Sequence, residues 1–368
     1  MKKLRVAVLF GGRSGEHEVS LVSATSVIEN LDKDKYEILP IGITKEGKWI
    51  SGQESLGLLK AGNAPKESNA LIPPEPADLS TSSNDASSQL GHIDMVFPVL
   101  HGPYGEDGTI QGFLELTGLP YAGCGVLGSA VSMDKVMQKK VIESEGIKQT
   151  PYIWFWSKEW NDRKDEIINE LSLSYPVFVK PPNMGSSVGI SKADNKDELI
   201  GAVEEAIQYD RKVIIEQGVK GARELEVSVL GNRNPKASVV GEIIPSNEFY
   251  DYDAKYVDGK TDEKIPAEIS DKVSKQIQDM AIKTYKALDG EGMARVDFLL
   301  SEDGEIYLNE MNTIPGFTSI SMYPKLWQAS GLSYKEILDE LIKLAIERAK
   351  EKAQLKVSYQ PKKEWYSD

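Results

Sequence analysis

Apolar and polar positions follow one another along the chain in segments whose spacing predicts strands and helices in turn. Residues 4–10 are almost wholly apolar, which predicts a buried strand, and a Gly-Gly-Arg-Ser-Gly loop at 11–15 follows it. Residues 18–31 carry helix-spaced apolar positions, and further strands are predicted over 36–44 and 93–100. A strand, a glycine-rich loop and a helix in this order indicate the entry to an open α/β domain.

The pattern predicts two further units of mixed strands and helices after the first. The second unit should hold a long helix, a strand, a loop of small residues, a helix and a strand, at 126–145, 175–180, 181–189, 196–208 and 212–216. The third should hold two strands and a helix before a hairpin and terminal helices, at 225–230, 237–244 and 270–288. We therefore expect an N-terminal open α/β domain (1–123) and two α+β subdomains, a central one (124–217) and a C-terminal one (218–368).

Residues 295–312 predict a β-hairpin, because two apolar runs flank the pair Asp303-Gly304. An Asp-Gly pair favours a two-residue loop with a type I′ turn, and this turn fixes which residues face one another. The predicted facing pairs are Glu302 with Glu305, Asp297 with Glu310, and Arg295 with Asn312. The last two pairs then project from one face of the hairpin, and a shift of one residue would turn them to opposite faces.

The facing carboxylates of Asp297 and Glu310 would repel each other unless a cation lay between them. Carboxylate and amide oxygens are the ligands that Mg²⁺ prefers, and phosphate oxygens complete its shell. With Asn312 as a third donor the hairpin predicts a magnesium site, and Arg295 adds a fixed positive charge beside it. The alternative is an exposed hairpin face with ordinary polar residues, which is less consistent with four polar groups in one register.

Composition limits the classes of function that the chain can have. The 57 acidic and 43 basic residues give a net charge of -14, which disfavours a general surface for nucleic acid or anionic membrane. Cys124 is the only cysteine, so no intrachain disulfide can form, and a cytoplasmic location is expected. The apolar run before Gly11 is too short for the core of a signal peptide, and no stretch reaches a transmembrane length. We expect neither nucleic acid nor membrane as a partner.

A lysine at the end of a predicted strand precedes a loop of small residues. Lys180 is followed by Pro-Pro-Asn-Met-Gly-Ser-Ser-Val-Gly at 181–189, and the backbone N–H groups of such a loop can surround phosphate, with Ser187 as a candidate ligand. The lysine precedes the glycines, so this is not a Walker A sequence, and an ordinary turn is the alternative. Lys135, on the preceding helix, is a second candidate for phosphate, against the alternative of a solvated helix lysine.

Two further segments are candidates for contact with a nucleotide. The strand that ends in Glu216-Gln217 leads toward the third unit, where a base can lie against backbone and carboxylate, and Glu224 is a candidate for ribose hydroxyls. A plain linker and an exposed side chain are the alternatives. The aromatic and charged segment 249–256 is typical of a loop that closes over a ligand, where Lys255 would meet a transferred phosphoryl group. A surface loop that covers the core edge is the alternative there.

Three other chemistries find little support in the sequence. Gly-Cys-Gly-Val-Leu-Gly at 123–128 matches the dinucleotide fingerprint, but the strand before it is weak and the acidic residue about 20 positions later, Glu145, ends a helix. His17, His92 and His101 lack the spacing of metal ligands, which argues against zinc. The Gly-x-Ser-x-Gly match at 185–189 lies within the loop of small residues after Lys180 and is not a sharp turn from a strand directly into a helix, so a serine hydrolase has little support.

Five segments, taken in order, resemble the D-alanine–D-alanine ligases, a family of ATP-grasp enzymes. These segments lie at 11–20, 101–112, 180–189, 250–256 and 295–316. The resemblance implies an ATP-grasp architecture of three units, in which the central and C-terminal units clamp ATP and the N-terminal unit helps to hold D-alanine. It also implies a homodimer.

The implied reaction passes the γ-phosphoryl group of ATP to the carboxylate of one D-alanine, and the amine of a second D-alanine then attacks the acyl phosphate. The product would be D-alanyl-D-alanine for peptidoglycan precursors. Lys135 and Lys180 would bind the phosphates of ATP. Asp297, Glu310 and Asn312 would ligate two Mg²⁺ ions, with Mn²⁺ as a substitute.

The resemblance also implies roles around the first D-alanine. Glu16 would receive its ammonium group, and Ser186 and Tyr256 would form a linked triad with Glu16. His101 would lie near the same substrate. Relatives that make a D-alanyl-D-lactate ester tend to carry Phe at the position of Tyr256, so Tyr implies the dipeptide.

Three more roles are implied for the second step. Arg295 and the backbone N–H of Gly316 would stabilise the tetrahedral oxyanion, and Ser321 would bind the carboxylate of the second substrate. The remaining alternatives are another ATP-grasp ligase with a different carboxylate and amine, a nicotinamide-dependent oxidoreductase, and a nucleotide-binding regulatory protein without turnover.

Overall fold

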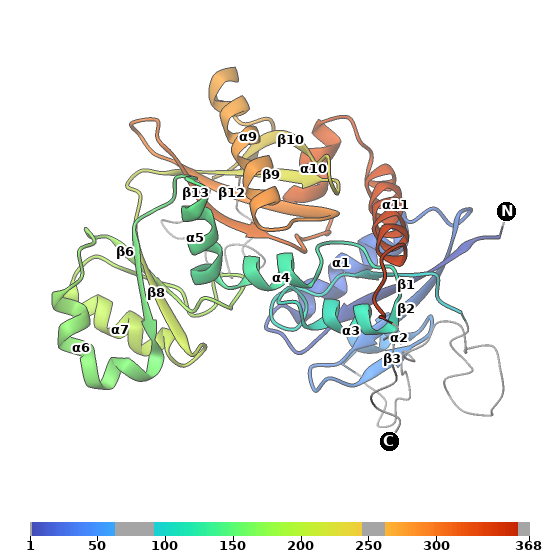
Figure 1. Cartoon of the computed structure of the whole chain (residues 1–368), viewed down its shortest axis with the longest axis horizontal. Coiled ribbons are helices and arrows are strands. Elements are labelled where there is room, and N and C mark those ends of the chain that lie inside the picture. Colours follow the sequence, from blue (N-terminus) through green and yellow to red (C-terminus); the bar gives the residue numbers. More distant parts are fainter. Residues whose placement is uncertain (1, 63–91, 245–261, 360–368) are drawn as a thin grey trace.

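The computed structural model describes residues 2–62, 92–244 and 262–359 (Figure 1). The first of its sheets has the strand order β3-β2-β1-β4. Strand β1 is parallel to β2 and β4. The strands are β1 (Leu4–Gly11), β2 (Tyr36–Ile43), β3 (Trp49–Ser51) and β4 (Met95–Pro98). The helices of this region are α1 (His17–Asn30), α2 (Ser55–Lys60) and α3 (Thr109–Thr117). The predicted α/β entry is confirmed, and β3, α2 and α3 are additions that the apolar pattern did not predict.

The second sheet is antiparallel, in the order β5-β8-β6-β7, and residues of β6 and β8 line a cavity that residues of the third sheet also line. Its strands are β5 (Tyr152–Trp156), β6 (Val177–Lys180), β7 (Ser191–Ala193) and β8 (Lys212–Gln217), and its helices are η3 (Ser157–Glu159), α6 (Trp160–Asn169) and α7 (Lys196–Ala206). Val177 and Val179 share a core with α7. Because side chains alternate along a strand, Lys180 and its neighbour Phe178 face the other way.

The third sheet has the order β11-β10-β9-β12-β13 and contains the predicted hairpin. Its strands are β9 (Arg223–Leu230), β10 (Lys236–Ile244), β11 (Asp262–Lys264), β12 (Met293–Leu300) and β13 (Ile306–Asn312), and its helices are α9 (Asp271–Ala287) and α10 (Met322–Ala329). Leu225 and Val227 of β9 pack in one core with Ile277 of α9. The same alternation turns Glu224 and Glu226 to the opposite face of the sheet.

The single helix predicted over 126–145 is wrong, because Asp134 divides it in two. Helix α4 spans Val126–Met133 and α5 spans Lys135–Ser144. The Asp134 backbone is extended, and its side chain accepts hydrogen bonds from the first free N–H groups of α5. An aspartate in this position is a favourable N-cap, so it begins a new helix instead of continuing the old one.

The predicted two-residue turn of the hairpin is also wrong. Gly304 N–H donates to Ser301 O and Ser301 N–H donates to Glu305 O, both at 3.0 Å, so the loop has three residues. Gly304 has φ +84°, which a three-residue hairpin loop requires at its last position.

The facing pairs at the far end of the hairpin are nevertheless as predicted, Asp297 with Glu310 and Arg295 with Asn312. The register shifts by one between Asp297 and Phe298, where Asn309 is the extra residue on β13. A longer loop and a β-bulge therefore cancel each other, and the polar residues beyond the bulge keep their common face.

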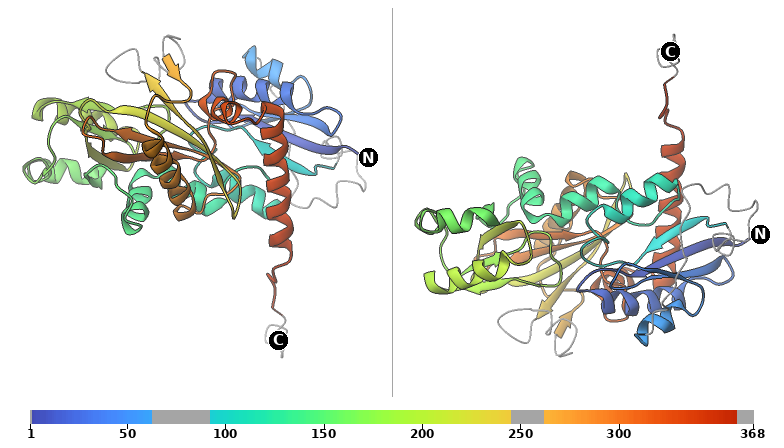
Figure 2. Two further views of the ribbon diagram at one scale, coloured as in Figure 1. Left: turned by 90° about the horizontal axis from the view of Figure 1, so that it is seen from above. Right: turned by 90° about the horizontal axis from the view of Figure 1, so that it is seen from below.

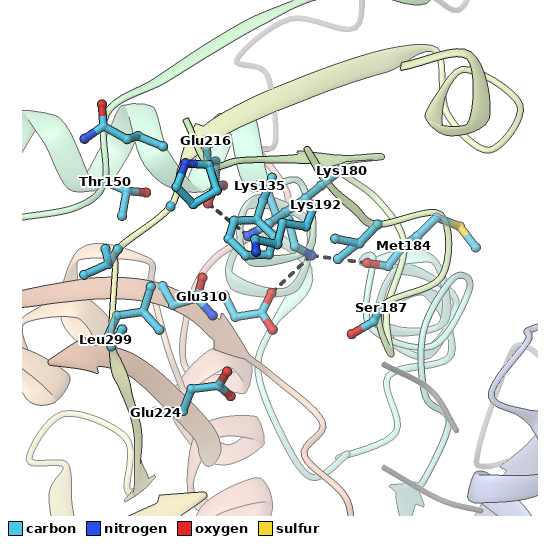
Figure 3. A pocket seen from close by; sticks show the side chains of 18 of the residues that line it. Lys135, Thr150, Lys180, Met184, Ser187, Lys192, Glu216, Glu224, Leu299 and Glu310 are labelled. Atoms are coloured by element: carbon cyan, nitrogen blue, oxygen red, sulfur yellow. Dashed lines mark hydrogen bonds and ion pairs between the residues drawn. The ribbon is translucent and has the colours of Figure 1, made fainter. Parts of the chain in front are cut away.

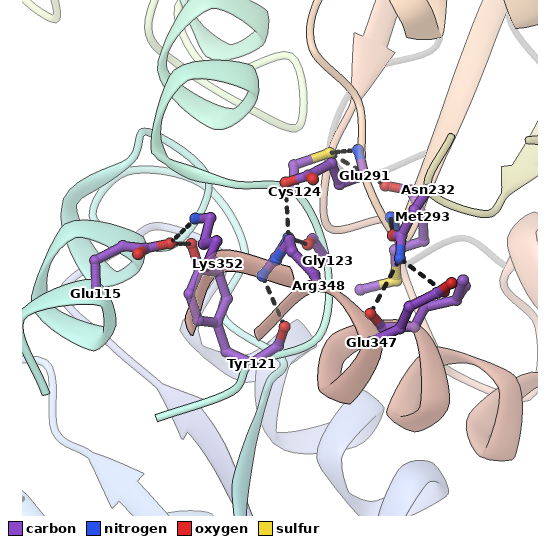
Figure 4. Close-up of polar contacts among 12 residues, drawn as sticks. Glu115, Tyr121, Gly123, Cys124, Asn232, Glu291, Met293, Glu347, Arg348 and Lys352 are labelled. Atoms are coloured by element: carbon purple, nitrogen blue, oxygen red, sulfur yellow. Dashed lines mark hydrogen bonds and ion pairs between the residues drawn. The ribbon is translucent and has the colours of Figure 1, made fainter. Parts of the chain in front are cut away.

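The last helix, α11 (Tyr334–Ala353), lies beside the first sheet in Figures 1 and 2. Its residues Ile337 and Leu341 share a core with Phe97 of β4. Arg348 of α11 donates to Tyr121 O at 2.8 Å and pairs with Glu291 at 3.2 Å (Figure 4). Residues predicted for the C-terminal subdomain thus complete the core of the N-terminal one, and the domain boundaries stay a prediction.

Candidate active site

Two adjoining cavities open on the third sheet, and the hairpin β12–β13 contributes to both. The larger cavity, of about 780 Å³, lies between the second and third sheets (Figure 3). The smaller cavity, of about 520 Å³, lies between the first and third sheets. Residues that line both are Glu106, Gly185, Ser186, Glu224, Leu299, Asn309, Glu310 and Asn312. A ligand in one cavity can therefore meet a ligand in the other at this shared wall.

Lysines from different elements line the larger cavity, and two of them are the predicted phosphate lysines (Figure 3). Lys135, the first residue of α5, has its Nζ 3.1 Å from Glu310 Oε2 and donates to Met184 O at 3.2 Å. Lys180, the last residue of β6, donates to Glu216 Oε2 at 2.9 Å. Burial alone would lower the pKa of Lys135, but the Glu310 carboxylate raises it above its ordinary value. Two ammonium groups that face one cavity suit a polyanion such as the phosphates of a nucleotide.

The N-cap of α5 explains where Lys135 lies. Asp134 caps the helix and also pairs with Lys212 of β8, so the start of α5 is fixed to the second sheet. Lys135 N–H donates to Pro182 O at 3.3 Å, which joins the helix to the loop 181–189. The predicted phosphate lysine and phosphate loop therefore lie next to each other.

The loop after Lys180 has an unusual backbone. Ser186 and Ser187 both adopt left-handed conformations, with φ +49° and +61°, which residues with a Cβ rarely adopt. Such conformations persist where the surroundings hold them, and they often occur at ligand-binding sites. Ser186 lines both cavities and Ser187 lines the larger one.

The larger cavity also holds the predicted base and ribose candidates. Glu216 and Gln217 end β8, and Glu224 lies in β9. Glu216 is 4% exposed, and although burial would raise its pKa, the lysines around it hold that pKa below the ordinary value. A buried, ionised carboxylate accepts hydrogen bonds but donates none.

In the smaller cavity, Glu16 presents a carboxylate at the start of α1. Ser186 donates to Glu16 Oε1, whereas Oε2 is buried with no hydrogen-bond partner among the described residues. A Cβ built on Gly185 would lie 2.3 Å from Oε2, and one on Gly102 would lie 2.6 Å from it. Glycine at both positions therefore leaves room for this carboxylate. A buried oxygen of this kind is suited to an incoming cation such as an ammonium group.

The segment after β13 is held by two residues of the first sheet's loops. His101 Nδ1 lies 3.0 Å from Ile314 O, and its Nε2 lies 3.0 Å from Ser23 Oγ. Because a carbonyl only accepts, Nδ1 must carry the proton, and burial lowers the pKa of His101 so that the ring is neutral. Glu106 Oε1 accepts from Ile314 N–H at 3.1 Å, and its Oε2 accepts from Gly102 N–H at 3.1 Å. The backbone C=O and N–H of Ile314 are thus both held by hydrogen bonds.

The polar face of the hairpin lies at the shared wall of the cavities. Arg295 donates to both oxygens of Asp297, at 2.8 and 2.7 Å, and lies 3.1 Å from Glu226. Asn312 Nδ2 donates to Asp297 Oδ2 at 2.9 Å. With Glu310 opposite Asp297, two carboxylates and one amide gather in one place. This donor set fits a hard divalent cation.

Comparisons with known proteins identify the family. The models "D-ala D-ala ligase N-terminus" and "D-ala D-ala ligase C-terminus" match residues 5–124 and 141–343. The chain belongs to the D-alanine–D-alanine ligase family. It is similar to a D-alanine–D-alanine ligase of Natranaerobius thermophilus, with 52% identity over 96% of this chain and 97% of that one.

Solved structures of the family have the same fold. The D-alanine–D-alanine ligase of Coxiella burnetii matches with a TM-score of 0.78 and 37% identity, over 96% of this chain and 97% of that one. The VanG D-Ala:D-Ser ligase of Enterococcus faecalis matches with a TM-score of 0.78 and 39% identity, over 94% and 100%. The predicted resemblance and the ATP-grasp fold class are confirmed.

Every predicted site residue that the structure describes lines at least one of the two cavities. Lys135, Lys180, Ser187, Glu216 and Gln217 line the larger one, Glu16, His101, Arg295, Asp297, Gly316 and Ser321 line the smaller one, and Ser186, Glu224, Glu310 and Asn312 line both. Lys255 and Tyr256 lie outside the described residues. The role of each residue in this family member stays a prediction.

Sequence reasoning assigned no role to Glu106, Glu226 or Lys139. Burial and the nearby charge of Glu16 raise the pKa of Glu106 to about 8. The sequence signal for Glu106 was its place in the segment 101–112, five residues after His101. The signal for Lys139 was its spacing of four from Lys135, which puts both on one helix face.

Proposed function

We propose that this chain joins two D-alanine molecules into D-alanyl-D-alanine, with ATP cleaved to ADP and phosphate, for the synthesis of peptidoglycan precursors. One observation carries the proposal: a cavity lined by lysines adjoins a cavity in which one buried carboxylate oxygen of Glu16 has no hydrogen-bond partner in the described part of the chain. The first suits the phosphates of ATP, and the second suits the ammonium group of an amino acid. The shared wall would then be the place where phosphoryl transfer occurs.

In the first step, Lys135 and Lys180 would hold the phosphates of ATP while Glu16 holds the ammonium group of the first D-alanine. The carboxylate of this D-alanine attacks the γ-phosphorus, the bond to ADP breaks, and an acyl phosphate forms. The amine of the second D-alanine then attacks the acyl carbon and loses a proton, and phosphate leaves. Arg295 and the N–H of Gly316 lie on the smaller cavity, where they would stabilise the oxyanion of this second step.

We also propose that Asp297, Glu310 and Asn312 hold two Mg²⁺ ions, which Mn²⁺ can replace. Support comes from the donor chemistry, since two carboxylates and an amide oxygen are hard ligands gathered on one face. When bound, the ions neutralise phosphate charge during transfer. Arg295 and Lys135 supply positive charge beside the same carboxylates, which keeps them in place.

Homodimer formation in the cytoplasm is a further part of the proposal. Leu116 of α3 and Leu127 of α4 are 82% and 61% exposed, and Phe113 of α3 is 36% exposed. Apolar side chains gathered on neighbouring helices are typical of a contact with a second copy of the chain. Sedimentation equilibrium tests this, and the mass of a single chain at micromolar concentration would contradict it. None of the described helices is long and apolar enough to cross a membrane.

Turnover of the purified protein tests the proposed reaction. ADP formation in the presence of ATP and Mg²⁺ should require D-alanine, and mass spectrometry should find D-alanyl-D-alanine. A parallel reaction with D-alanine and D-serine tests the mixed product named for the Enterococcus faecalis relative. Release of phosphate with L-alanine but not with D-alanine would overturn the proposal. Oxidation of added NADH would instead support the nicotinamide alternative.

A further inference from the structure

A second lysine of α5 lies behind the larger cavity and has no part in the reaction described so far. Lys139 follows Lys135 by four residues, which puts both on one face of the helix. It is 2% exposed and does not line the cavity. Its Nζ lies 3.2 Å from Thr150 Oγ1 and 3.6 Å from Glu216 Oε1. A lysine this deeply buried costs solvation free energy, so its retention calls for a partner or a task.

Glu216 has a different lysine at each of its two oxygens. Lys139 approaches Oε1, and Lys180 donates to Oε2 at 2.9 Å. The two lysines differ in position, because the Lys180 side chain is 12% exposed and lines the cavity, whereas that of Lys139 is 3% exposed. A nucleotide can therefore draw Lys180 away from Glu216, but Lys139 stays. Glu216 would then keep one cation in both situations.

We infer that Lys139 is a positioning residue for nucleotide selection: it keeps Glu216 ionised and fixed while Lys180 turns to the nucleotide. An ionised carboxylate accepts from the exocyclic amine of adenine but repels the carbonyl oxygen of guanine at the same place. A site built for one hydrogen-bond pattern discriminates against a base that leaves its groups unpaired. The inference rests on the proposed ATP site and goes further, because it assigns the choice of base to a residue that the base does not touch.

Replacement of Lys139 by methionine tests the inference, since methionine keeps the length of the chain without its charge. In Lys139→Met we expect KM for ATP to rise by at least about tenfold, and the preference for ATP over GTP in kcat/KM to fall by a similar factor. KM for D-alanine should stay within about twofold of wild type. Lys140→Met is the matched control, because Lys140 is exposed on the same helix and contacts Trp154. It should behave as wild type.

A double-variant cycle separates charge compensation from packing. Glu216→Gln keeps the shape of the side chain but removes the charge that Lys139 balances. Adding Lys139→Met to Glu216→Gln should therefore change KM for ATP and the base preference little. Three results would overturn the inference. They are an equal rise in KM for ATP in both backgrounds, an unchanged preference for ATP over GTP, and equal rises in KM for ATP and for D-alanine in Lys139→Met. If Lys139→Met alone does not fold, the double variant Lys139→Met with Glu216→Gln decides. A preference for ATP over GTP equal to that of Glu216→Gln would support the inference, and failure of the double variant to fold would overturn it. Wild-type turnover that does not depend on D-alanine would instead refute the proposed function.

Discussion

The two cavities differ in how their carboxylates are balanced. In the larger cavity two carboxylates have lysines beside them, since Glu216 has a lysine near each oxygen and Glu310 has Lys135. In the smaller cavity acids are in excess. Glu16 there has a buried oxygen without a partner in the described part of the chain, and Glu106, at the wall shared by the two cavities, has a pKa of about 8. The first arrangement can release cations to a polyanion, and the second can receive a cation. The difference matches ATP on one side and an amino acid on the other.

Loss of a carboxylate at the shared wall should have the largest effect, because both cavities depend on it. Asp297→Asn keeps the shape of the side chain and removes the charge that faces Glu310 across the hairpin. We expect kcat to fall by roughly a thousandfold, since stabilisation of phosphoryl transfer by a bound cation amounts to several kcal/mol. Steady-state ADP release at saturating substrates measures it. Asp303→Asn, in the exposed hairpin loop, is the matched control, and a fall of less than tenfold in Asp297→Asn would contradict the metal assignment.

Replacement of the carboxylate in the smaller cavity should separate the two ligands. In Glu16→Gln we expect KM for the first D-alanine to rise by about thirtyfold, because a hydrogen bond to a charged group is replaced by a neutral one. KM for ATP should change by less than about threefold. Glu18→Gln on the same helix is the control, since Glu18 is exposed and forms an ion pair with Lys45. Equal rises in both KM values would show that the cavities do not divide the ligands in this way.

A smaller effect of the same kind should follow from Gly185→Ala. The new Cβ would lie 2.3 Å from Glu16 Oε2, so the carboxylate must move away from the place where it meets the substrate. We expect about a tenfold rise in KM for D-alanine, because a displaced hydrogen-bond acceptor loses part of its contact. Gly201→Ala, where a Cβ meets nothing within 4 Å, is the control. Tight D-alanine binding in Gly185→Ala would place the first substrate elsewhere in the cavity.

The hairpin shows how far sequence reasoning reaches. Local turn chemistry predicted its position and three facing pairs. The pair Glu302 with Glu305 is wrong, because Glu302 lies in the loop, and the two pairs beyond the bulge are right only because a third loop residue and the bulge at Asn309 cancel. A bulge depends on packing of both strand faces, which spacing alone does not report. Similarly, the sequence pattern placed Asp134 as one polar position inside a long helix, although its side chain caps the start of a second helix, α5. Apolar periodicity cannot distinguish a polar helix residue from a cap.

The cavity residues show a different limit. Motif resemblance located those that would contact a ligand, such as Glu16 and Lys180, because such segments occur in a recognisable order. It did not locate Glu106 or Lys139, which act on other protein groups and are recognised only when sheets far apart in sequence meet. Nor did it predict that α11 completes the core of the first sheet, because that contact joins residues over 200 positions apart.

The excess of acid in the smaller cavity should also appear in the pH dependence of stability. Glu106 has a folded-state pKa of about 8 against an ordinary value of 4.5, because it is buried and lies near Glu16. The folded chain therefore binds this proton more tightly than the unfolded chain, so the stability it contributes is complete below pH 4.5 and is lost as pH rises to about 8. The slope for one proton is at most about 1.4 kcal/mol per pH unit.

Urea unfolding between pH 5 and pH 9 measures this slope for wild type and for Glu106→Gln. Glutamine cannot ionise, so the variant should lose less stability than wild type as pH rises through this window. Its absolute stability at pH 5 should be lower, because an amide nitrogen cannot accept one of the two N–H groups that Glu106 holds. All other titrating groups are common to both proteins, so only the difference between the two slopes reports on Glu106. Identical slopes would mean that Glu106 ionises normally, and the contrast between the two cavities would then rest on Glu16 alone.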